Sequence, residues 1–186
     1  MLHGGAEHNL APVADRSRSL WRSRLMYDAI HRRLDREGLA VAVVRFSTVG
    51  WNDPAAPSPV PDARWALEEM RGSYAGLPIA LLGHSMGART AFAVADDPDV
   101  VGVVGLAPWF PADEDVAPIT GKHLVAAHGS GDRITYASAT RTLLERASGV
   151  AASSQFIDMG PTGHYMLRRR REWDRVAVES TLQVLR

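Results

Sequence analysis

Residues 79–93 read IALLGHSMGARTAFA, and this stretch carries the strongest indication of a fold in the sequence. An apolar run leads into GHSMG at residues 83–87, which has the pattern G-x-S-x-G, and an alanine-rich run leaves it. The pattern is typical of a sharp turn from a strand into a helix, with a strained serine exposed at the apex. Glycines on both sides have no Cβ atom, which lets the strand and the helix approach closely. We therefore predict a buried strand, a tight turn and a helix, with Ser85 as a candidate nucleophile.

Strand and helix patterns alternate along the rest of the chain. Short apolar runs predict strands, and helical periodicity predicts helices between or after them. Strands that alternate with helices form parallel βαβ units, so we expect an α/β fold in three layers, with a mostly parallel sheet of about five to six strands flanked by helices. The predicted strands cover residues 39–46, 77–82, 100–106, 123–127 and 154–159, and the predicted helices cover residues 19–37, 62–71 (with Asp62 as N-cap), 136–147 and 168–185.

Composition restricts the class of protein. A chain of 186 residues, of which 46% are hydrophobic, predicts one domain over residues 1–186. The formal net charge is zero, which gives no electrostatic reason to expect nucleic acid or an anionic membrane as a partner. Without cysteine there is no disulfide scaffold or thiolate metal site. No secretory signal or apolar spanning segment is visible, so we expect a soluble cytoplasmic protein whose oligomeric state the sequence leaves open.

The seven histidines do not indicate a metal site. No pair has the H-x-x-x-H spacing with a supporting carboxylate, so we expect neither a metal nor another cofactor. We expect His84 and His128 to pack or to make local hydrogen bonds, and His3 to anchor a turn. The arginine run at residues 168–171 is interpreted as a solvated helix turn.

A serine nucleophile needs a base, and the base needs a carboxylate that orients it. Asp132 follows the fourth predicted strand, and His164 follows the fifth. In an open α/β sheet, residues beyond the carboxyl ends of the strands converge on one edge, so these side chains could meet Ser85 there. Asp132 could instead be a solvated residue or a helix cap. Asp158 is the rival acid, but it lies within a strand pattern and close in sequence to His164.

An acyl-transfer site also needs N–H donors for the oxyanion that develops on the substrate. The first candidate is the backbone N–H of Met86, directly after Ser85. The second should come from a glycine-rich turn, and HGGA at residues 3–6 fits that role. We predict that Gly5 supplies this N–H, with Ala6 as the alternative.

Together, GHSMG, HGSGD and GHYML, each after a predicted strand, with HGGAE at the front, resemble the α/β-hydrolase superfamily. The lidless dienelactone-hydrolase-like and small esterase branches are the most similar. The resemblance implies that Ser85 is the nucleophile, His164 the base and Asp132 the acid partner. It says little about substrate, because the superfamily hosts many reactions. We expect a serine hydrolase of small carboxylic esters; the alternatives are a thioesterase of the same mechanism and a non-catalytic binding module that has kept the fold.

The sequence departs from the family pattern in two ways, and each departure leads to an expectation. The family has two or three strands before the HG motif, whereas only Met1 and Leu2 precede it here, so the fold is shortened at its N-terminal side. Either the true start lies upstream or a stub of strand is enough, and we expect a loosely held first turn and a weak oxyanion hole. Residues 107–122 are too few for a helical cap. The site should be open, with Trp109 and Phe110 as an apolar wall and Trp51 either lining the pocket or plugging the core.

Overall fold

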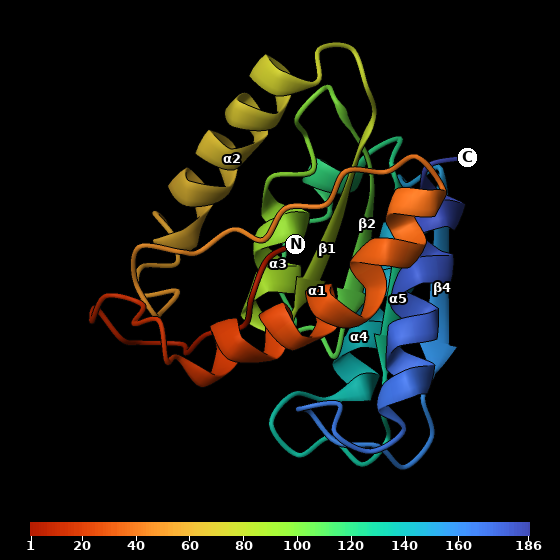
Figure 1. Cartoon of the computed structure of the whole chain (residues 1–186). Helices are drawn as coiled ribbons and strands as arrows, with labels where there is room; N and C mark the ends of the chain where they lie inside the picture. Colours follow the sequence, from red (N-terminus) through yellow and green to blue (C-terminus); the bar gives the residue numbers. More distant parts are fainter.

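The computed structural model describes all 186 residues and arranges them in three layers around a parallel sheet (Figure 1). The sheet consists of β1 (Ile79–His84), β2 (Val100–Leu106), β3 (His123–His128) and β4 (Ser153–Asp158), in that spatial order. Each strand is parallel to its neighbour, so all four carboxyl ends lie at one edge. At that edge the loops after β3 and β4 lie side by side, joined by a hydrogen bond from Ser130 N to Gly160 O (Figure 1). The predicted α/β fold in three layers is confirmed.

Helices cover both faces of the sheet. They are α1 (Arg18–Arg36), α2 (Pro59–Ser73), α3 (Met86–Ala93), α4 (Ala137–Ala147) and α5 (Arg170–Val184), with a short 3-10 turn at Ala117–Ile119. One face is covered by α1 and α5, and the other by α2, α3 and α4 (Figure 1). A membrane crossing would need a longer and more apolar helix than any of these.

Each face of the sheet carries its own hydrophobic cluster. Successive side chains of a strand point to opposite faces, so Val103 joins the cluster beneath α2, α3 and α4, whereas Val104 joins the cluster beneath α1 and α5. Both side chains are fully buried. The near-continuous apolar runs of the central strands follow from this burial on both faces.

The strand predicted at residues 39–46 is absent, and the sheet has four strands rather than five to six. In this segment only Val44 forms a bridge, to Leu2, which also bridges Gly83 of β1. The segment has the composition of a strand, but only Leu2 of the neighbouring segment pairs with it, so no ladder forms. Leu2 thus lies between Val44 and β1 and bridges both.

The start of α2 also differs from expectation, because Asp62 is not its N-cap. The helix begins at Pro59, and proline suits a first turn since its missing N–H would have no helical partner there. The carboxylate of Asp62 instead accepts hydrogen bonds from the backbone N and the hydroxyl of Ser47, at 2.6 and 2.7 Å. Asp62 thereby ties α2 to the segment that follows Val44.

Candidate active site

Ser85 lies in the turn between β1 and α3, with φ 54° and ψ −120°. A residue other than glycine in this region costs of order 1–3 kcal/mol, so the surroundings must hold it in place. The backbone on both sides is closely packed: a Cβ atom at Gly83 would lie 2.3 Å from Gly87 O, and one at Gly87 would lie 2.3 Å from Leu2 O. Gly83 therefore serves the close approach of strand and helix that the sequence predicted, whereas Gly87 lets α3 approach residues 2 and 3.

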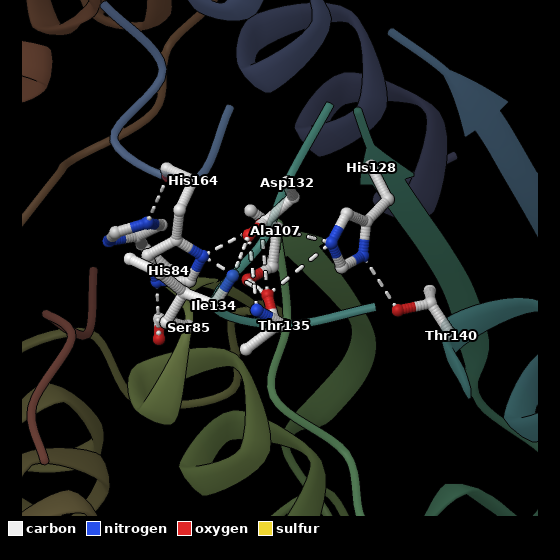
Figure 2. A network of polar contacts seen from close by, with 9 residues as sticks. All are labelled: His84, Ser85, Ala107, His128, Asp132, Ile134, Thr135, Thr140 and His164. Atoms are coloured by element: carbon white, nitrogen blue, oxygen red, sulfur yellow. Dashed lines mark hydrogen bonds and ion pairs between the residues drawn. The ribbon is translucent and has the colours of Figure 1, made fainter. Parts of the chain in front are cut away.

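The turn brings Ser85 to His164 and Asp132 at the carboxyl edge of the sheet. Oγ of Ser85 lies 2.9 Å from Nε2 of His164, and Nδ1 of the same ring lies 2.8 Å from Oδ2 of Asp132. Figure 2 shows the imidazole between the hydroxyl and the carboxylate. All three residues are buried. The structure brings together the three side chains that the sequence singled out, from loops far apart in the chain.

Hydrogen bonding fixes the proton positions on His164. A carboxylate only accepts, so Nδ1 carries the hydrogen and donates it to Asp132. In the neutral ring Nε2 then has a lone pair, which can accept the hydroxyl hydrogen of Ser85. This is the tautomer that a general base acting on Ser85 requires.

Five donors surround the carboxylate of Asp132 (Figure 2). The backbone N–H groups of Ile134 and Thr135 donate to Oδ1 at 2.8 and 3.0 Å. The Thr135 hydroxyl at 2.9 Å and Nε2 of His128 at 3.1 Å donate to Oδ2, beside His164. Burial acts to raise the pKa of Asp132, but the hydrogen bonds outweigh it and hold that pKa well below its usual range. Asp132 is therefore an anion at neutral pH.

His128 makes the local hydrogen bonds that we expected of it. Because Nε2 donates to Asp132, Nδ1 is left to accept, and the Thr140 hydroxyl lies 2.8 Å from it. The rival acid, Asp158, lies elsewhere: its half-exposed carboxylate pairs with Arg141 at 3.0 Å and accepts a hydrogen bond from Gly160 N. No hydrogen bond or ion pair joins Asp158 to His164.

The glycine-rich first turn lies against Ser85. A Cβ atom built at Gly4 would be 3.3 Å from Cβ of Ser85, and Gly5 packs on the side chain of Met86. The backbone N–H groups of Gly5 and Met86 donate to no atom of the protein, so both are free for a ligand. Ala6, the alternative to Gly5, is not available, because its N–H donates to Val49 O at 3.0 Å.

We expected this turn to be loosely held; in the structure the side chain of His3 connects it to the core. The ring of His3 is fully buried; its Nε2 accepts a hydrogen bond from Phe46 N at 3.1 Å, and its Nδ1 donates to Gly4 O at 2.6 Å. Burial lowers the pKa of His3, which favours the neutral ring that this pattern needs. The turn is thus anchored from within the core.

The three aromatic residues proposed for the pocket lie in different surroundings. Phe110 is buried against Phe92, with ring centroids 5.3 Å apart, and Trp51 is buried as well. Trp109 is partly exposed, and its backbone N donates to Ser85 O at 3.3 Å, which places it directly beside the turn. Of the three, Trp109 alone offers surface next to Ser85.

A charged residue that the sequence did not point to, Arg89, packs against both tryptophans, whose rings meet edge-on with centroids 6.1 Å apart. The guanidinium carbon of Arg89 lies 4.1 Å from the ring centroid of Trp51 and 4.7 Å from that of Trp109. Arg89 also pairs with Glu114, and the two side chains are only 11% and 10% exposed. Arg89 follows Ser85 by about one turn of α3, and its backbone N donates to Ser85 O at 3.3 Å, so this stack lies next to the turn at Ser85.

Solved structures with a similar fold include a serine hydrolase without a lid from Xanthomonas campestris, with 18% identity, a TM-score of 0.70, and coverage of 98% of this chain and 82% of that chain. An alpha-beta serine hydrolase homologue from Coxiella burnetii has 19% identity and a TM-score of 0.66, over 97% of this chain and 88% of that one. An esterase from Pyrococcus furiosus has 14% identity and a TM-score of 0.62, over 77% and 71%. At these identities the likeness shows the fold alone.

No curated protein sequence matches the chain. The model of one protein family, described as the Alpha/beta hydrolase family, matches residues 1–182. This match spans the turn at Ser85 and the loops that carry Asp132 and His164. The chain belongs to the alpha/beta hydrolase family.

Proposed function

We propose that the protein is a serine hydrolase that cleaves small carboxylic esters through an acyl-serine intermediate. The observation that carries the proposal is the chain of contacts from Ser85 Oγ to His164 Nε2 at 2.9 Å and from His164 Nδ1 to Asp132 Oδ2 at 2.8 Å. A nucleophile, a base and a group that orients the base, all within hydrogen-bond reach, form the arrangement that activates a hydroxyl.

In the first half of the reaction, Oγ of Ser85 attacks the ester carbonyl carbon while Nε2 of His164 takes the hydroxyl proton. The carbonyl electron pair moves onto the oxygen, and the free N–H groups of Gly5 and Met86 stabilise that negative charge. The anionic Asp132 stabilises the imidazolium. When the tetrahedral intermediate collapses, the C–O bond to the alcohol breaks, and the alcohol leaves with the proton from His164.

In the second half, water replaces the alcohol. Nε2 of His164 takes a proton from the water as its oxygen attacks the acyl carbon. The second tetrahedral intermediate then expels Ser85, whose oxygen recovers the proton from His164. The products are an alcohol and a carboxylic acid, and the protein returns to its initial state.

The surroundings of Ser85 support a small substrate. Trp51 and Phe110 are buried, and the stack of Arg89 against the tryptophans lies next to the turn at Ser85. The segment between β2 and β3 contains only the short turn at Ala117–Ile119, so no helical cap encloses a ligand. A site with little enclosure favours compact esters and gives little discrimination among them.

A fluorophosphonate probe tests the proposal, because it reacts with an activated serine. We expect labelling at Ser85, its loss in Ser85→Ala, and hydrolysis of p-nitrophenyl acetate only where labelling occurs. A thioester is attacked by the same groups, so acetyl and butyryl oxyesters and thioesters should be compared on one preparation. If the folded wild-type protein does not label, the proposal is wrong, and a non-catalytic binding module is the better interpretation.

A further inference from the structure

The loop that carries His164 is held by two donors that come from other parts of the fold. Nε2 of His84 lies 3.0 Å from the backbone oxygen of His164 (Figure 2). Nε of Arg22 lies 3.0 Å from the backbone oxygen of Tyr165, the next residue. Two successive carbonyl groups of the connection between β4 and α5 are therefore fixed from outside it, by β1 and by α1.

Both donors are buried and belong to rigid elements. The residues are only 4% (Arg22) and 6% (His84) exposed. His84 is the last residue of β1 and directly precedes Ser85 in the chain. The same residue is hydrogen-bonded to the backbone of His164, so it connects the nucleophile and the base. A displacement of the loop would change the distance between Ser85 Oγ and His164 Nε2, on which proton transfer depends.

The hydrogen bond to His164 settles the tautomer of His84. A carbonyl oxygen only accepts, so Nε2 carries the hydrogen and Nδ1 is an acceptor. Burial and the neighbouring His164 lower the pKa of His84 to about 3, so the ring stays neutral and keeps this tautomer. Nδ1 itself has no partner in the protein, and neither have Nη1 and Nη2 of Arg22.

Arg22 and His84 line the same small cavity, of about 10 Å³, between α1 and β1. That volume holds about one water molecule, and a buried water needs two or more polar partners. The remaining walls are mostly apolar and include Met26, Leu82 and Leu106. A guanidinium that can only donate and a ring nitrogen that can only accept are complementary to the two roles of one water.

We propose that Arg22, His84 and one ordered water form a clamp that positions His164 against Ser85. The water accepts a hydrogen bond from Arg22 and donates one to Nδ1 of His84, which keeps Nε2–H directed at the His164 carbonyl. Arg22 Nε holds the following carbonyl at the same time. Neither side chain touches the substrate, so both are positioning residues. The inference rests on the proposed function, because it takes His164 as the base.

The test compares variants that remove a donor with variants that keep it. His84→Leu and Arg22→Met remove the hydrogen bonds at similar volume, and we expect kcat to fall about tenfold to a hundredfold with KM nearly unchanged. His84→Gln offers an amide N–H near the position of Nε2 and should recover most of kcat. Where Arg22→Met does not fold, Arg22→Lys replaces it: the lysine nitrogen lies one bond further along the side chain than Nε of arginine, so the hydrogen bond to Tyr165 O should be distorted and kcat should still fall.

A matched control separates positioning from general destabilisation. Thr181→Ala removes a buried hydrogen bond to Ala177 O within α5, so it should lower the melting temperature and leave kcat unchanged. A second readout is the low-field proton resonance of His164 Nδ1–H, which should shift or broaden in His84→Leu but not in Thr181→Ala. A crystal structure of the wild type should show the water within hydrogen-bond distance of Arg22 and His84, and that of Arg22→Met should lack it.

The outcomes distinguish the clamp from the proposed function. If the wild type does not label with fluorophosphonate, the proposed function fails and the clamp with it. If the wild type labels but His84→Leu and Arg22→Met keep both kcat and the Nδ1–H resonance, the clamp alone is overturned. A wild-type cavity that contains a protein side chain in place of a water overturns the water's part in it.

Discussion

The hydroxyl oxygen of Thr135 lies 2.9 Å from Oδ2 of Asp132. The same hydroxyl is 3.1 Å from Nδ1 of His164, which carries its own hydrogen toward that carboxylate. Thr135 and His164 thus donate side by side to one oxygen. The Thr135 hydroxyl therefore stabilises the anionic Asp132 without competing for Nε2 of His164, which stays directed at Ser85.

This arrangement predicts a modest effect of Thr135 on both stability and rate. Thr135→Val removes a hydrogen bond to a buried charge, which should cost about 1–3 kcal/mol in the free energy of unfolding. It also removes one of the five donors that hold the Asp132 carboxylate against His164, so kcat should fall several-fold with KM unchanged. Thr135→Ser keeps the hydroxyl and should retain wild-type kcat. Urea unfolding and steady-state kinetics on the three proteins provide the check, and equal kcat in Val and Ser variants would contradict the prediction.

Asp132→Asn should cost far more activity than stability. An amide in place of the carboxylate can donate to Nδ1 and so favour the wrong tautomer of His164, which should lower kcat about 10³- to 10⁴-fold. Asp158→Asn is the matched control, since the carboxylate of Asp158 pairs with Arg141 and forms no hydrogen bond or ion pair with His164; its kcat should stay at the wild-type value. Single-turnover acylation rates measure the effect directly. A large loss in the Asp158 variant would show that the acid partner has been misassigned.

The buried His84 predicts that stability falls with acid. Its pKa is about 3 in the fold, below the ordinary 6.5, because burial and then the neighbouring His164 disfavour the charged ring. Between these two values the unfolded chain binds a proton that the folded chain does not. The free energy of unfolding should therefore decrease as pH falls below about 6.5, by about 1.4 kcal/mol per pH unit from this residue.

Denaturant unfolding at several pH values between about 7 and 4 measures that slope. His84→Gln has no titrating ring, so its free energy of unfolding should change less with pH, by about 1.4 kcal/mol per pH unit, which is the contribution of one proton. Thr181→Ala is the control, because it removes no titrating group and should leave the slope unchanged. Identical slopes in the wild type and in His84→Gln would mean that the ring of His84 is accessible to protons in the fold.

The sequence predicted the placement of Ser85, Asp132 and His164 for a reason that belongs to parallel sheets. Each residue stands just after an apolar run, and the carboxyl ends of parallel strands share one edge. Recognising the three therefore required only local patterns and one topological rule. The same logic failed for residues 39–46, because an apolar composition shows that a segment suits a sheet, whereas a ladder also depends on the length of its neighbour.

Other parts of the site had no local signal. Arg22 and Tyr165 are 143 positions apart, and nothing around either residue indicates their contact. Arg89 reads as an ordinary residue of an alanine-rich helix until the fold places Trp51 and Trp109 beside it. Of these residues, Thr135 could have been predicted most easily from the sequence, since a threonine shortly after an aspartate in a loop often donates to that aspartate. Contacts of this kind depend on packing between elements, which patterns within one element do not encode.

Two glycines provide a last matched comparison. A Cβ atom at Gly87 would lie 2.3 Å from Leu2 O and 2.5 Å from His3 O, whereas one at Gly72, within α2, would meet nothing within 4 Å. Gly87→Ala must push the first turn away from α3, so it should lose about 1–3 kcal/mol of stability or more. Because that turn carries the N–H of Gly5, kcat should fall as well. Gly72→Ala should instead gain about 0.5–1 kcal/mol, since alanine restricts the unfolded chain and favours the helix. Melting temperatures and kcat for both variants decide the matter: a Gly87→Ala protein as stable and as active as the wild type would show that residues 2–3 do not pack against the turn at Ser85.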